Sequence, residues 1–133
     1  MIKQKINIPL YSYTLYLYKL SFEDYKHKEN MLTSKLKLRR WPINLDEETC
    51  NEIDENIKNG CYNGAITCRE KSERKIVVFF YPIDNEESEA EIYTHEKRHV
   101  EDDILNHLGI DDAEASAYLA GFLGKIFYKF RKA

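Results

Sequence analysis

The chain has 133 residues, which is enough for one domain with a modest core and leaves little for a second, so we expect a single domain over residues 1–133. Hydrophobic residues make up 43% and charged residues 32%, a balance that argues against a disordered chain. The net charge of −3 gives no reason to expect a nucleic-acid partner.

Strands followed by a short helix are expected at the start of the chain. Residues 1–20 favour strands, because apolar and aromatic residues alternate with polar ones there. Pro9 interrupts this run, removes one ladder donor and suggests an edge position or a bulge. Ser21, with Asp24 three residues later, is a candidate cap for a short helix.

The middle of the chain predicts one helix and a hairpin. Asn44 is a candidate cap for the helix, whose first turn is acidic, and Gly60 is positioned to end it. Strands are expected at 65–70 and 75–81, joined by a polar turn at 71–74. The second strand is apolar on both faces, which is typical of a strand inside a sheet or covered by a helix.

Two long helices are expected in the last third of the chain. The first begins at Ser88, which has a capping-box acid three residues later, and ends at Gly109. The second begins at Asp111 or Asp112 and reaches Phe130. This order of elements predicts an α+β fold, in which a small, mostly antiparallel or mixed sheet packs against helices.

The expected location of the chain is the cytoplasm. No run approaches the ~18 apolar residues of a membrane-spanning helix, and polar residues interrupt the apolar N-terminal residues, unlike in a signal peptide. Cys50, Cys61 and Cys68 form no CxxC pair and are expected to be reduced. We therefore expect neither a membrane nor a nucleic acid as a partner.

The segment that most resembles a functional site is HEKRH, at positions 95–99 inside the first of the two long helices. Residues four apart share one helix face, with about 5–6 Å between Cβ atoms, so the imidazoles of His95 and His99 can reach one ion. Glu96 leans toward the same face, where it can take a proton from water without being a ligand. This HExxH pattern predicts a zinc ion bound by both histidines, with Glu96 as general base.

A zinc site that keeps one position open for water needs a third protein ligand. Glu114 is the best candidate, because the Gly109 turn folds the last helix back on the motif helix. Tyr118, one turn further along, can donate a hydrogen bond to a ligand carboxylate or to a developing oxyanion. The rival ligands are Glu101, Asp102, Asp103 and Asp112. The first three of these are disfavoured, because they directly follow His99 and do not easily turn back to the ion.

Each of these residues also has an interpretation without metal. Two histidines in one helix also occur at surfaces and helix interfaces by chance, and we expect His27 and His107 to be incidental. Asp111 and Glu114 have the spacing of a helix cap and its N3 acid, and Tyr118 is more often a packed aromatic than a catalytic donor. The residue types alone leave these alternatives open.

The run from His95 to Leu123, HEKRHVEDDILNHLGIDDAEASAYLAGFL, resembles small phage and prophage proteins of the HExxH metallopeptidase-like kind. In these proteins a Gly-Ile turn and an acidic Glu-x-x-Ala-Tyr-Leu-x-Gly segment follow the motif helix. The resemblance extends more weakly to the early IPLY strand and to the hairpin GAITCRE…KIVVFFYPI. It implies a minimal gluzincin-type, zincin-like domain with one zinc ion per chain, in which His95, His99 and Glu114 are ligands and Glu96 is the general base.

Motif and resemblance together predict a zinc-dependent metallopeptidase, in which zinc-activated water hydrolyses a peptide bond. The substrate is then a protein or peptide, which can pair with an exposed edge strand. An alternative is a non-catalytic zincin-scaffold protein of phage or mobile-element origin that binds a host or phage protein. The lack of room for the second lobe of larger gluzincin peptidases favours this alternative, and a phage-encoded protein of either kind acts in the host cytoplasm. A third hypothesis is a helical interaction module without metal.

Overall fold

A four-stranded mixed sheet organises the fold in the computed structural model, which describes residues 1–70 and 74–133. The strands are β1 (Ile2–Ile8), β2 (Tyr13–Lys19), β3 (Ala65–Glu70) and β4 (Lys75–Phe80). The helices are the 3-10 helix η1 (Asp24–Met31) and the α-helices α1 (Glu47–Lys58), α2 (Glu86–Leu108) and α3 (Ala113–Lys132). The strand order is β1-β2-β4-β3, in which β2 and β4 are parallel and the outer pairs are antiparallel. The predicted α+β class is confirmed.

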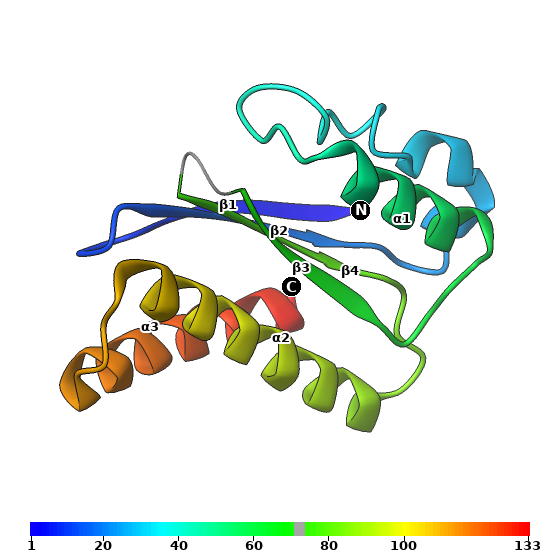
Figure 1. Cartoon of the computed structure of the whole chain (residues 1–133). Helices are drawn as coiled ribbons and strands as arrows, with labels where there is room; N and C mark the ends of the chain where they lie inside the picture. Colours follow the sequence, from blue (N-terminus) through cyan, green and yellow to red (C-terminus); the bar gives the residue numbers. More distant parts are fainter. Residues whose placement is uncertain (71–73) are drawn as a thin grey trace.

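Helices cover both faces of the sheet, with η1 and α1 over one face and α2 and α3 over the other (Figure 1). Because side chains alternate along a strand, β4 contributes to two cores. Toward α2 and α3 it presents Ile76, Val78 and Phe80, and toward α1 it presents Val77 and Phe79. Every residue of β4 is buried, which confirms the prediction that this strand is internal.

The sequence made predictions for the connections of both hairpins, at Pro9 and at 71–74. Pro9 lies in the loop between β1 and β2, directly after the edge strand β1, so the expected edge position agrees with the sheet order. Of the predicted turn at 71–74, residues 71–73 lie outside the described residues. The guanidinium of Arg74 donates a hydrogen bond to the carbonyl of Tyr11 at 3.0 Å, which ties the start of β4 to the loop before β2.

The two helices of the first half begin differently from the prediction. The helix after Ser21 is a 3-10 helix, and His27 inside it has a non-helical backbone with φ −132° and ψ 53°. The cap of α1 is Asp46, whose carboxylate accepts the N–H of Thr49 at 2.7 Å. Asn44 has a left-handed φ of 55°, so the chain turns at the predicted cap, and the cap of α1 lies two residues later, at Asp46.

The hairpin of α2 and α3 follows the sequence prediction closely. The cap of α2 is Asn85 rather than Ser88, because the N–H of Ser88 donates to the Asn85 side-chain oxygen at 2.7 Å. Gly109 ends α2 with a left-handed φ of 67°, as predicted. Asp112 caps α3 by accepting the N–H of Glu114 at 2.7 Å. The two helices are therefore joined by a short, well-capped turn.

A stacked aromatic pair sets how α2 lies on the sheet. The rings of Tyr93 and Phe80 are 4.0 Å apart and nearly parallel, at 7°. Val100 and Ile104, two and three turns further along α2, are fully buried in the same core. This buried row determines which flank of α2 faces β3.

Replacing Phe80 by alanine is expected to lower the free energy of unfolding by about 3–5 kcal/mol, because it removes a fully buried ring and leaves a cavity under α2. Urea denaturation followed by circular dichroism measures the change. The matched control is Phe22→Ala, at a ring that is 47% exposed, for which a much smaller loss is expected. Equal losses for the two variants would refute the role given to Phe80.

Candidate metal centre

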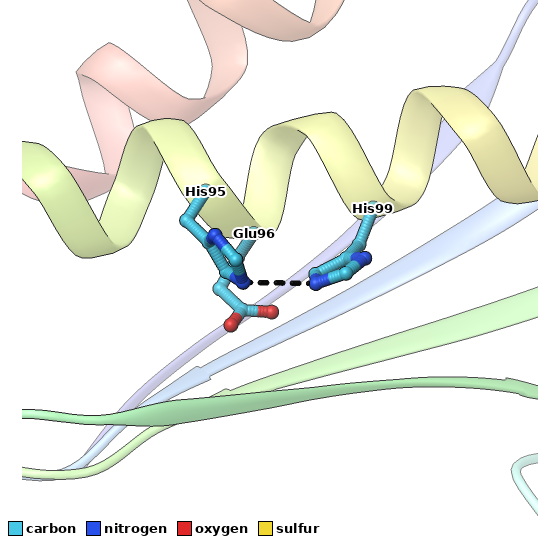
Figure 2. A group of neighbouring side chains, drawn as sticks. All are labelled: His95, Glu96 and His99. Carbon is cyan, nitrogen blue, oxygen red and sulfur yellow. Dashed lines mark hydrogen bonds between the residues drawn. The ribbon is translucent and has the colours of Figure 1, made fainter.

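The HExxH segment lies on the flank of α2 that faces the edge strand β3. Glu96 belongs to the buried row of α2 together with Tyr93 and Val100. His95 and His99 lie beside this row, and both remain exposed. Figure 2 shows all three motif side chains pointing from α2 toward the strands. The fold thus gathers two of the predicted ligands, His95 and His99, and the predicted base Glu96 at the edge of the sheet.

The two imidazoles converge through the nitrogens that a zinc site uses. The Nε2 atoms of His95 and His99 are 2.9 Å apart (Figure 2). The ligand atoms of both histidines and of Glu96 all lie within 4.8 Å of one another. Two nitrogens bound to tetrahedral zinc at ordinary bond lengths are about 3.3 Å apart, so the rings need to separate only slightly. Imidazoles with a carboxylate suit zinc, and the residues therefore fit this ion.

Thr67 on β3 anchors the carboxylate of Glu96. Its hydroxyl donates a hydrogen bond to Glu96 Oε2 at 2.5 Å. Glu96 is only 5% exposed, so this hydrogen bond stabilises a carboxylate that few water molecules can reach. Among residues 1–70 and 74–133, Glu96 Oε1 forms no hydrogen bond and remains available. Sequence reasoning missed Thr67, because the meeting of β3 with the middle of α2 is a long-range contact.

A hollow of about 310 Å³ surrounds the candidate centre. Its lining residues are Ala65, Ile66, Thr67, His95, Glu96, His99 and Asp103. Asp103 was a disfavoured rival ligand, yet its position one helical turn after His99 keeps it on the same flank of α2. Burial raises the pKa of the Asp103 carboxyl, and the positive charges of Arg69 and His99 oppose this rise.

The structure does not bring Glu114 to the motif. The helix continues beyond His99 to Leu108, about 14 Å further along its axis, before the turn that precedes Glu114. Glu114 is exposed in the first turn of α3 and is absent from the group of converging ligand atoms. Its role as third ligand stays a prediction that the arrangement of side chains does not favour.

The helix α3 packs on the side of α2 away from His95 and His99, which does not suit the predicted roles of Glu114 and Tyr118. The hollow between the two helices is lined on α2 by Ala90, Thr94 and Lys97, which lie roughly opposite His95 and His99 on the helix. On α3, the predicted donor Tyr118 is 44% exposed and stacks against Phe122. Tyr118 is not among the residues that line the candidate centre.

The other rival ligands have structural partners. Lys97 lies 3.3 Å from the Glu101 carboxylate, and Arg98 lies 3.3 Å from that of Asp102. Asp112 caps α3. These three acids are therefore engaged away from the two imidazoles.

The remaining histidines and the cysteines lie outside the converging group. His107 accepts or donates a hydrogen bond at Nδ1 with the buried hydroxyl of Tyr13, so it has a structural contact. His27 belongs to η1, over the other face of the sheet. Cys50, Cys61 and Cys68 are free thiols, as predicted. None of these residues joins the metal group among the described residues.

Comparison of the chain with protein-family models, with curated proteins and with solved structures found no match. Within the part of the chain that the structure describes, no helix has both the length and the apolar character needed to cross a bilayer.

Replacing Thr67 by valine is expected to destabilise the fold by about 1–3 kcal/mol, because it leaves the buried Glu96 carboxylate without its donor while keeping the shape of the side chain. Urea denaturation at neutral pH measures the loss. Thr94→Val is the control, since the Thr94 hydroxyl is exposed and bonds only to a carbonyl of its own helix. A Thr67→Val protein as stable as the Thr94→Val protein would show that the bond contributes nothing.

Proposed function

We propose that this chain is a zinc-dependent hydrolase with a minimal zincin-type site, acting on peptide bonds. The observation that carries the proposal is the convergence of His95 Nε2 and His99 Nε2 beside the buried carboxylate of Glu96. The HExxH spacing alone allows this convergence, and the packing of α2 against β3 adds the acid and its hydrogen-bond donor.

Each residue of the site has a distinct role in the proposed reaction. When bound, zinc would lower the pKa of a water molecule toward ~7 and polarise the scissile carbonyl. His95 and His99 would hold the ion through Nε2. Glu96 takes the proton of the attacking water and passes it to the leaving amine. The Thr67 hydroxyl orients Glu96 through Oε2, which directs the second carboxylate oxygen to the reaction.

The position of β3 supports an extended peptide as substrate. Among the described strands, β3 lies at the end of the sheet order and pairs only with β4, so the outer edge of residues 65–69 can accept another strand. The hollow at the candidate centre borders one part of β3. A peptide added along this edge would pass His95 and His99.

A second candidate function follows from the position of Glu96. One oxygen of its carboxylate lies within 4.8 Å of a ring nitrogen of each imidazole, whereas Glu114 lies beyond the turn after α2. If Glu96 fills the third ligand position, the site has no general base and binds metal without hydrolysis. The chain would then be the non-catalytic zincin-scaffold protein, with a protein partner in place of a substrate.

Metal content tests the proposed ligands. The wild-type chain is expected to retain about one zinc ion after loading and gel filtration, and His95→Ala and His99→Ala are expected to lose it. Glu114→Ala should keep the ion, because Glu114 lies outside the converging group. Elemental mass spectrometry gives the ratio of zinc to protein, with His27→Ala as a control for the loss of a distant histidine. Zinc-free wild-type protein, or zinc retained in both motif variants, would refute the site.

Glu96→Gln separates the two candidate functions. In the hydrolase, the amide is expected to abolish cleavage of a casein or peptide-library substrate while zinc content stays near the wild-type value. In the non-catalytic protein, the same change removes a ligand and lowers zinc affinity, and the wild type cleaves nothing. The paired readout of zinc content and cleavage therefore assigns Glu96 as base or as ligand.

A further inference from the structure

His99 has one ring nitrogen for the metal and one without a partner. Its Nε2 faces Nε2 of His95 at 2.9 Å, which leaves Nδ1 on the other side of the ring. Figure 2 shows this second nitrogen directed away from His95, toward the C-terminal part of α2. A neutral imidazole that binds metal through Nε2 carries its proton on Nδ1, and that proton needs an acceptor.

Asp103 occupies the place where such an acceptor belongs. It follows His99 by one helical turn, about 6 Å along the axis, a spacing at which side chains meet. Its side chain is partly buried and lines the same hollow as the two histidines. Within residues 1–70 and 74–133, Asp103 forms no hydrogen bond and no ion pair. A side-chain rotation that joins it to His99 Nδ1 therefore breaks no existing bond.

Direct ligation by Asp103 is disfavoured by the helix itself. His95 and Asp103 lie two turns apart, about 12 Å along the axis, which is too far for a short carboxylate to share an ion held between His95 and His99. Arg69 on β3 places a positive charge near Asp103.

We infer that Asp103 is a positioning residue of the candidate centre, whose carboxylate accepts the Nδ1–H of His99 and holds the ring with Nε2 toward the ion. The assignment rests on the proposed metal site and adds a residue to it. This assignment also fixes the donor in the hydrogen bond between the two rings of the metal-free protein. His95 carries its proton on Nε2 and donates the hydrogen bond to the unprotonated Nε2 of His99.

Zinc affinity of the full chain, measured by competition with a chromophoric chelator, tests this role. Asp103→Ala is expected to weaken zinc binding by about 10–100-fold, and Asp103→Asn, which keeps an oxygen acceptor, is expected to weaken it less. The matched control is Asp102→Ala, because Asp102 pairs with Arg98 on the outer face of α2. Equal affinities for Asp103→Ala and Asp102→Ala would overturn the inference. A loss as complete as in His99→Ala would overturn it too, since Asp103 would then be a ligand.

The tautomers of the metal-free protein provide a readout that does not depend on zinc. In nitrogen-15 NMR spectra of the imidazoles, His99 is expected to carry its proton on Nδ1 and His95 on Nε2, and Asp103→Ala is expected to abolish this preference. Protonation of His99 on Nε2 in the wild type would overturn the inference. Wild-type protein without zinc affinity would refute the proposed function alone, because the tautomers decide the role of Asp103 separately. Circular dichroism of each variant verifies that it is folded.

Discussion

The packing of α2 on the sheet through Tyr93 and Phe80 is the interaction on which the candidate centre depends. An α-helix turns by about 100° per residue, so the buried aromatic pair determines which flank of α2 faces β3. With this rotation, Glu96 reaches the hydroxyl of Thr67 and both histidines lie at the sheet edge. A rotation by a single residue would turn Glu96 away from β3.

The chemistry of the site depends on Glu96, whose carboxylate is the one that converges with both imidazoles among residues 1–70 and 74–133. Thr67 holds one oxygen of the Glu96 carboxylate, and the side chain is almost fully buried. The second oxygen can therefore either accept a proton or bind the metal. As a free base it supports hydrolysis, and as a metal ligand it leaves the site without a base. Asp103, in the same hollow, orients His99 in either case. The two candidate functions therefore share one metal site and differ in one proton acceptor.

Local patterns predicted the elements well and the contacts between them poorly. Gly109, the apolar run of β4 and the HExxH spacing act within a few residues, and the structure confirms the elements that they predicted. The caps of α1 and α2 were misplaced, because nearby Asp46 and Asn85 are equally good caps. Thr67 and Asp103 were missed or disfavoured, since their roles depend on which flank of α2 meets β3 and on which flank meets α3. Glu114 was chosen because the chain folds back, although the side on which α3 packs could not be known.

X-ray absorption spectroscopy at the zinc edge, on protein loaded with one equivalent of zinc, tests the central claim most directly. The account predicts a first shell of nitrogen and oxygen at about 2.0–2.1 Å with the outer-shell scattering of two imidazoles. This imidazole scattering should fall in His95→Ala and His99→Ala protein. A shell with sulfur at about 2.3 Å, or a spectrum without imidazole scattering, would contradict the assignment of His95 and His99 as the metal ligands.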